Sequence, residues 1–334
     1  MISRSLITKI FVICIVQITA VESFVLAQQA TDSEVASKID LSRHDFLYAG
    51  EAKVQDMYIV KDGKVVWEHK GPRVEEYLGE ISDAVMMTNG NILFAHQYGI
   101  TLINQKDETL WNYKAPANTE IHTAQPIGKK HIIYVQNGNP AKVNVMNIET
   151  NKIVHSFIVP VKNPDNTHGH FRHARLTKNG TYLLAHMDLG KVAEYDFDGN
   201  EVWSINAPGV WSAEPLKNGN VLLCGSDRWI REVNKNKEVV WDFKLDDHPQ
   251  YKMTSPQIAT RLDNGNTIIN TWFSQWGDKL DLKNPPIQVI EVTPRKEVVW
   301  VLQSWEDPYL GPSTTIQVLG DKRISEHAHF GNIK

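Results

Sequence analysis

The stretch HGHFRHARLTKNGTYLLAHMD, residues 168–188, holds four histidines and two arginines. Imidazole changes its charge near neutral pH and can act as a base, a nucleophile or a metal ligand. Three chemistries fit such residues. A divalent metal could bind three imidazoles and a carboxylate or amide. A histidine could remove the proton α to a uronate carboxylate while Arg172 or Arg228 neutralises the charge, or it could be the nucleophile of sulfuryl transfer.

The chain that carries these histidines is a repeat. Six segments end alike, for example GKVVWEHK at 63–70 and GNEVWSINAP at 199–208. The equivalent positions are Trp67, Trp111, His155, Trp203, Trp241 and Trp300. A period near forty residues indicates one supersecondary unit per repeat. We expect the repeated tryptophan, and His155 in its place, to fill the wedge between neighbouring units.

Each unit also begins alike, with apolar alternation, Asn-Gly and a second apolar run, as in RLTKNGTYLLAH at 175–186. Asn-Gly between such runs predicts a hairpin with a type I′ turn, in which both central residues have positive φ. With two further strands, each unit predicts four antiparallel strands, A to D, and therefore one blade of a β-propeller.

The fold class is therefore all-β, a six-bladed β-propeller over residues 46–330, with seven blades as the alternative. Five blades are complete within the chain. We expect residues 313–330 to supply strands A and B of the sixth blade and residues 46–70 to supply strands C and D. Closure of this kind removes exposed sheet edges.

The start of strand A and the end of strand B share one face of a propeller. That rule places eight of the thirteen histidines together, namely His96, His122, His168, His170, His173, His186, His327 and His329. The candidate catalytic residues are His173, His122, His186 and Arg172. The candidate substrate-binding residues are His96, His170, Trp211, Glu214, Asp227, Arg228 and Trp272. Loops at 160–171 and 272–286 lie on the same face, and the aromatic residues of the second loop could stack on a sugar.

The repeats, with Asn-Gly-Asn after strand A and Gly-x-x-x-Trp in strand D, resemble the pyrroloquinoline-quinone-like (PQQ-like) propeller repeats. This resemblance implies the propeller fold for roughly residues 46–330. Quinone-dependent dehydrogenases of that superfamily carry an adjacent cysteine pair, whereas only Cys224 remains here outside the leader, so PQQ is not expected. The run from His173 to Gly180 is locally similar to arylsulfotransferase-type propellers, in which a histidine is transiently sulfonated.

Composition limits the partners and the location. Arg4 and Lys9 precede a short apolar run, which predicts a signal peptide over 1–27, a lead-in over 28–45 and a secreted or periplasmic protein. We expect no membrane span in the mature chain. The formal net charge of −4 gives no basic face for nucleic acid.

Two functions from different classes remain. The first is an enzyme that binds and processes a carbohydrate or another anionic small molecule by histidine-based chemistry, with or without a divalent metal. The second is a non-catalytic scaffold that binds a protein or glycan. The sequence does not decide between an enzyme and a scaffold, and it does not identify a metal.

Overall fold

The computed structural model describes residues 29, 33–50, 55–74, 78–273 and 280–320 of the 334-residue chain. Two units are distinguished, residues 1–39 and residues 40–334, and the second is the propeller. The predicted signal peptide lies outside the described residues. Among those described, no helix is long and apolar enough to cross a membrane.

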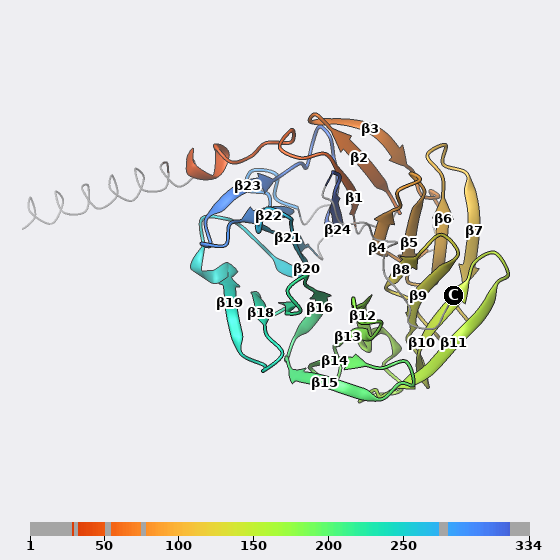
Figure 1. The fold of residues 1–334 in the computed structure, drawn as a ribbon. Helices are drawn as coiled ribbons and strands as arrows, with labels where there is room; N and C mark the ends of the chain where they lie inside the picture. The colour runs from red at the N-terminus through yellow and green to blue at the C-terminus, as the bar shows by residue number, and fades with distance from the viewer. Residues whose placement is uncertain (1–28, 30–32, 51–54, 75–77, 274–279, 321–334) are drawn as a thin grey trace, which may run out of the picture. The chain divides into compact units, whose positions relative to one another are not determined.

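In the described part of the chain, the strands form six four-stranded antiparallel sheets around a centre (Figure 1). The first blade contains β24 (Ser313–Val318), β1 (Phe46–Gly50), β2 (Met57–Lys61) and β3 (Lys64–His69). The second contains β4 (Ile81–Met86), β5 (Ile92–His96), β6 (Gly99–Ile103) and β7 (Thr109–Lys114). The third contains β8 (Ala124–Ile127), β9 (His131–Gln136), β10 (Ala141–Asn147) and β11 (Lys152–Val159).

The other three blades follow in chain order. The fourth contains β12 (Phe171–Leu176), β13 (Tyr182–His186), β14 (Lys191–Tyr195) and β15 (Glu201–Asn206). The fifth contains β16 (Val210–Pro215), β17 (Val221–Gly225), β18 (Trp229–Val233) and β19 (Val239–Lys244). The sixth contains β20 (Ser255–Arg261), β21 (Thr267–Trp272), β22 (Val289–Val292) and β23 (Val298–Leu302). Two short 3₁₀ helices, η1 (Thr167–Gly169) and η2 (Leu245–Asp247), lie in loops.

The six-bladed prediction is confirmed, but the composition of the closing blade is not the expected one. The C-terminal segment supplies one strand, β24, which pairs with β1, while the N-terminal segment supplies three. FLYAG at 46–50 is fully buried and apolar, and it forms strand B of this blade. The sequence pattern predicts strand B from the C-terminal segment instead. His327 and His329, expected at the end of a strand B, lie outside the described residues.

The repeated tryptophan joins each blade to the next, as predicted. The indole Nε1–H of Trp203 donates to the Lys235 carbonyl at 3.0 Å, and that of Trp300 donates to the Asp40 carbonyl at 2.5 Å. His155, which replaces tryptophan in the third blade, stacks on Phe197 with ring centroids 3.9 Å apart. An aromatic ring in the wedge between blades therefore serves packing in every repeat.

The Asn-Gly hairpins form, but not with the expected turn. Gly180 has φ of +78° whereas Asn179 is not among the residues with positive φ, and the Gly180 N–H donates to the Thr177 carbonyl at 3.0 Å. This is a type I turn followed by a left-handed glycine, the other common short hairpin. Asp62-Gly63 does have two positive φ angles, as a type I′ turn requires.

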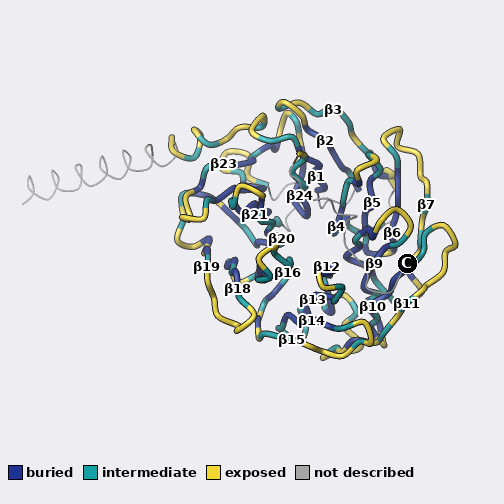
Figure 2. Tube along the Cα trace, viewed as in Figure 1, coloured by how far each residue is buried: buried dark blue, intermediate teal, exposed yellow. Residues whose placement is uncertain are grey.

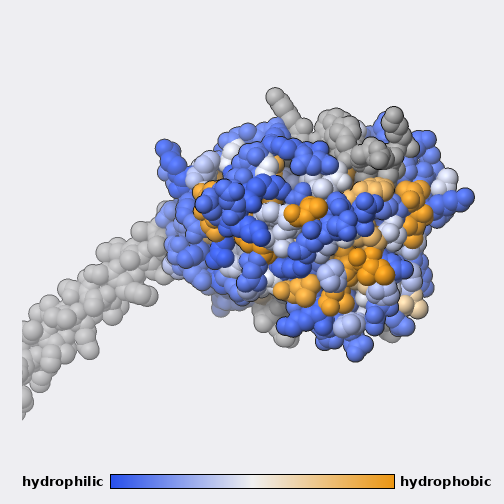
Figure 3. All heavy atoms as spheres, turned by 60° about the horizontal axis from the view of Figure 1, so that its bottom comes forward, coloured by the Kyte–Doolittle hydropathy of each residue, from blue (hydrophilic) through white to orange (hydrophobic). Residues whose placement is uncertain are grey.

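Burial is highest in the middle strands of each blade, while the innermost strands carry half-buried residues and the rim is mostly exposed (Figure 2). Strands such as β1 and β17 are buried at every residue, while the outermost strands β3 and β7 alternate exposed and half-buried residues. The face in Figure 3 is mostly hydrophilic with apolar residues interspersed. Exposed apolar residues of the chain include Val202 on β15. The buried middle strands form a rigid frame for side chains at the centre.

Candidate functional site

The innermost strand of a blade starts with a bulge, and these bulges build one end of the central channel. In β4 the pairing register shifts between Ile81 and Asp83, so Ser82 is the extra residue. The pairing register of four other innermost strands shifts at the equivalent position. Their extra residues are Arg172, Trp211, Gln257 and Thr314. A bulge turns a side chain away from the ladder, and bulges are frequent beside active sites.

The third blade carries one extra residue too, because Glu120 pairs with Asn137 and Ala124 with Tyr134. His122 lies in that segment. We name the six residues of these irregular segments the mouth ring. The mouth ring consists of Ser82, His122, Arg172, Trp211, Gln257 and Thr314.

A cavity of about 90 Å³ opens at the mouth ring. Its lining residues are Glu80, Ser82, His168, Arg172, His173, Trp211, Gln257, Ile258, Trp272 and Thr314. Pockets that enclose drug-sized ligands measure roughly 300–1,000 Å³. This cavity therefore fits a small group, such as a carboxylate or one end of a sugar ring. The channel-facing wall includes two indole rings, Trp211 and Trp272, whose centroids lie 6.3 Å apart.

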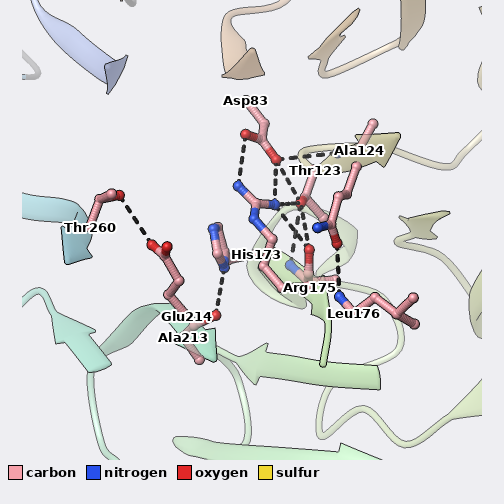
Figure 4. Close-up of polar contacts among 11 residues, drawn as sticks. Asp83, Thr123, Ala124, His173, Arg175, Leu176, Ala213, Glu214 and Thr260 are labelled. Carbon is pink, nitrogen blue, oxygen red and sulfur yellow. Dashed lines mark hydrogen bonds and ion pairs between the residues drawn. The ribbon is translucent and has the colours of Figure 1, made fainter. Parts of the chain in front are cut away.

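His173 is the buried imidazole of this cavity, with 1% of its surface exposed. Its Nδ1–H donates to the Ala213 carbonyl at 3.0 Å, which leaves a lone pair on Nε2. Figure 4 shows the ring standing between Glu214 and Arg175, with Nδ1 turned to Ala213. Among the described residues, Nε2 has no hydrogen-bond partner. Burial, reinforced by the charge of Arg175, lowers the pKa of His173 to about 3, so the ring is neutral.

A second constellation lies at the edge of the cavity. The Glu120 carboxylate accepts a hydrogen bond from His122 Nε2–H at 2.7 Å and another from His168 Nδ1–H at 2.9 Å. Burial opposes ionisation of Glu120, but the hydrogen bonds from His122, His168 and Gln97 outweigh it and lower the pKa of the carboxyl group. Burial, then the charge of Arg172, lowers the pKa of His122 to about 4. Glu120, His122 and His168 form a group that could hold a metal.

Arg172 connects the two parts of the site. Its Nη2–H donates to His168 Nε2 at 2.5 Å, and its guanidinium lies over the Trp211 ring, 5.5 Å from the centroid. Arginine stacks on aromatic rings and binds carboxylate or sulfate through paired donors. The cavity thus presents a cation, an imidazole lone pair and an aromatic wall to the same small volume.

A buried ion pair lies in the channel next to His173. Asp83 accepts hydrogen bonds from Arg175 Nη1 at 2.8 Å and Nη2 at 3.1 Å, and from the Thr123 hydroxyl at 2.9 Å (Figure 4). Burial would raise the pKa of Asp83, but the charge of Arg175, together with the hydrogen bonds from Arg175 and Thr123, lowers it. Glu214, predicted to bind substrate, accepts from the Thr260 hydroxyl at 3.1 Å in the same channel.

Seven of the eleven candidate residues lie outside the cavity lining: His122 and Glu214, described above, and five others. His186 and His96 pair with Phe171 and Ile81, so they do end at the expected face. His186 is hydrogen-bonded to Tyr195, and His170 donates to the Asn163 carbonyl. Arg228 binds Asp246 and the carbonyls of Met253 and Thr254, which fixes a loop, and Asp227 is exposed. Their proposed roles stay predictions.

Sequence reading missed Ser82, Glu80 and Glu120. A signal for Ser82 was present, because the innermost strands share a pattern in which alanine follows two variable residues. The matching runs are Ile81-Ser82-Asp83-Ala84, Ile121-His122-Thr123-Ala124, Phe171-Arg172-His173-Ala174 and Val210-Trp211-Ser212-Ala213. The second residue of each run belongs to the mouth ring. Glu120 precedes this pattern, and only the folded chain brings it to His168.

The fold and the site define a six-bladed β-propeller with a histidine-rich cavity at one mouth. No protein-family model matches the chain, and no curated protein matches it significantly. Among solved structures, a protein of unknown function from Bacteroides caccae is 22% identical with a TM-score of 0.70, covering 82% of this chain and 98% of that one.

Two lyase structures are more distant. A streptogramin B lyase is 11% identical with a TM-score of 0.51, covering 78% of this chain and 88% of its own. Virginiamycin B lyase from Staphylococcus aureus has the same identity and TM-score, covering 78% of this chain and 85% of its own. At these identities the likeness establishes the propeller fold alone. The finer resemblance to PQQ-like repeats and arylsulfotransferases stays a prediction.

Proposed function

We propose that the protein is an enzyme that binds a small anionic carbohydrate, or a similar anionic ring compound, at the mouth ring and acts on it through His173. The single observation that carries the proposal is His173 Nε2. It is a buried lone pair without a partner among the described residues, in a cavity that also contains Arg172. Other buried polar atoms of the described residues, such as His170 Nδ1, also lack a partner, but His170 does not line the cavity, whereas His173 does. An unsatisfied buried polar atom beside a cavity often marks a ligand site.

The other lining residues fit the same ligand. Arg172 would hold the carboxylate, Trp211 and Trp272 would stack on the ring, and Glu80 and Gln257 would accept or donate hydrogen bonds to hydroxyl groups. A carboxylate bound beside a neutral imidazole raises its pKa because the negative charge favours the imidazolium. The substrate itself would therefore make His173 a better base for the proton α to that carboxylate.

Sulfuryl transfer is the second candidate, favoured by one feature of His173. Its Nε2 bears no hydrogen, so it could attack the sulfur of an aryl sulfate as the S–O bond breaks and the aryl oxide leaves, while Arg172 balances the charge on the transferred group. The two reactions differ in what Nε2 receives, a proton or a sulfuryl group. A non-catalytic scaffold would bind a protein or glycan through the residues that line the cavity, without chemistry at His173.

Turnover by wild type and His173→Gln separates these functions. Uronate oligosaccharides report elimination by absorbance of the unsaturated product, and aryl sulfates report sulfuryl transfer. We expect turnover on one panel, falling by at least about 100-fold in His173→Gln. His131→Gln is the matched control, because His131 lies at the start of β9, outside the cavity lining.

Two outcomes would contradict the proposal. Turnover that survives in His173→Gln would remove His173 from the reaction. Binding without turnover in the wild type, weakened by Trp211→Ala, would identify the cavity as the ligand site of a scaffold.

A further inference from the structure

Three potential metal ligands converge where the third and fourth blades meet. Glu120 and His122 precede β8, and His168 lies in η1 before β12. One ligand atom of each residue lies within 4.8 Å of the others. His122 is buried, whereas the His168 side chain is 52% exposed and lines the cavity. A bound ion would therefore keep an open side toward the cavity.

The donor set selects a class of metal. Two imidazoles and one carboxylate suit zinc, iron, cobalt or manganese, whereas magnesium and calcium prefer oxygen ligands alone. Zinc–ligand distances near 2.1 Å place tetrahedral ligand atoms roughly 3.4 Å apart. The present separations from Glu120 are 2.7 Å to His122 and 2.9 Å to His168. These two separations would therefore have to open by roughly 0.7 Å and 0.5 Å to admit the ion.

Metal binding would change which nitrogen of His168 carries the proton, and this change affects Arg172. At present His168 Nδ1–H donates to Glu120, so Nε2 can accept from Arg172 at 2.5 Å. A metal on Nδ1 moves the proton of the neutral ring to Nε2. Nε2–H and the guanidinium are then two donors facing each other, and the contact is lost.

His122 has no such conflict. Its Nε2 would bind the metal, and the proton would move to Nδ1, which lies 3.1 Å from the Ser82 hydroxyl. The hydroxyl oxygen then accepts instead of donating, and the hydrogen bond is kept. Arg172 is therefore the group that metal binding displaces.

We propose that Glu120, His122 and His168 bind a divalent transition metal, and that metal binding breaks the hydrogen bond from Arg172 Nη2 to His168. Arg172 already lines the cavity, and the Nη2 donor could then turn to a bound anion, so by linkage a bound anion would tighten metal binding. The metal site stands without the proposed function, and the role of the released Arg172 rests on it.

The test uses the full mature chain without an affinity tag. Calorimetry with Zn²⁺, and visible absorption with Co²⁺, should give one equivalent bound. We expect Glu120→Gln and His168→Gln to weaken Zn²⁺ binding by at least about 100-fold. Mutation of a residue that only supports a metal ligand already costs about 10- to 100-fold in affinity, and loss of the ligand itself should cost at least as much. His131→Gln should bind as the wild type does. Thermal unfolding of each variant checks that the fold is kept.

Arg172→Met gives the more selective result. We expect it to bind Zn²⁺ about tenfold more tightly, because the change removes both a competing donor and a nearby positive charge. Wild-type affinity no greater than that of Glu120→Gln would overturn the metal site. Weaker binding in Arg172→Met would overturn the release of Arg172, since it would mean that the arginine supports the site.

The two proposals fail separately. If Zn²⁺ does not bind while turnover still depends on His173, the metal site is wrong and the proposed function stands. If Zn²⁺ binds as expected while His173→Gln retains full turnover, the metal site stands and the proposed function is wrong.

Discussion

Three buried histidines should make the fold sensitive to mild acid. His122, His173 and His186 are at most 1% exposed, and burial lowers their pKa values from 6.5 to about 4, 3 and 3. The unfolded chain binds protons on these rings below pH 6.5, whereas the folded protein does not. Stability is therefore lost as the pH falls through 6.5 toward the folded values.

The size of the effect follows from the shifts. At pH 5.5 each of these three neutral rings lowers the free energy of unfolding by about 1.4 kcal/mol, or about 4 kcal/mol together. His96, whose pKa is lowered by burial to about 4, adds a similar amount. The carboxyl groups with lowered pKa values, such as Asp83 and Glu120, lose their contribution only below about pH 4.5. Between pH 7.5 and 5.5 the histidines therefore dominate the change.

Urea unfolding at pH 7.5 and 5.5 measures the difference directly. His186→Gln should shrink that difference by about 1.4 kcal/mol, and comparing one variant at two pH values cancels its general loss of stability. Equal wild-type stability at the two pH values would refute the reasoning. It would mean that the folded protein takes up these protons, so the rings would not be held neutral.

Two further predictions concern the channel and the N-terminus. Asp83→Asn should destabilise the fold by about 3–5 kcal/mol in urea unfolding, because it leaves the Arg175 charge, only 15% exposed, without its partner. Asp83→Asn with Arg175→Met should recover much of that loss, and no recovery would argue against the ion pair. Export with cleavage after Ala27 should leave a mature chain that begins at Gln28, which mass spectrometry of the exported protein checks. A chain that retains Met1 would contradict export by cleavage.

The sequence predicted the fold well because the fold is repetitive. Trp203 and Trp300 occur at a regular position, and the same packing requirement between blades recurs in each repeat. The closing blade was harder to assign because its strands come from both ends. FLYAG at 46–50 fits strand B or strand C equally well by pattern, and only pairing with both β24 and β2 decides it.

The site was predicted less completely than the fold. The strand pattern predicts which face of the propeller a residue lies on, but not whether its side chain points into the channel or into the blade. His186 and His173 both lie at the predicted face. His173 turns toward the channel, whereas His186 packs on Phe171 with ring centroids 4.5 Å apart. Successive side chains along a strand point to opposite sides of the sheet, and a bulge reverses this alternation locally. Sequence pattern alone does not reveal the bulge.

The mouth ring differs from the residues that pack the blades against one another. The residues that pack the blades repeat along the chain, because each wedge imposes the same geometry. The mouth ring does not repeat, since its members are serine, histidine, arginine, tryptophan, glutamine and threonine. Six equivalent positions with six different side chains are not required by packing. Their diversity at one end of a closed channel favours a ligand that is asymmetric and small enough to touch several blades at once.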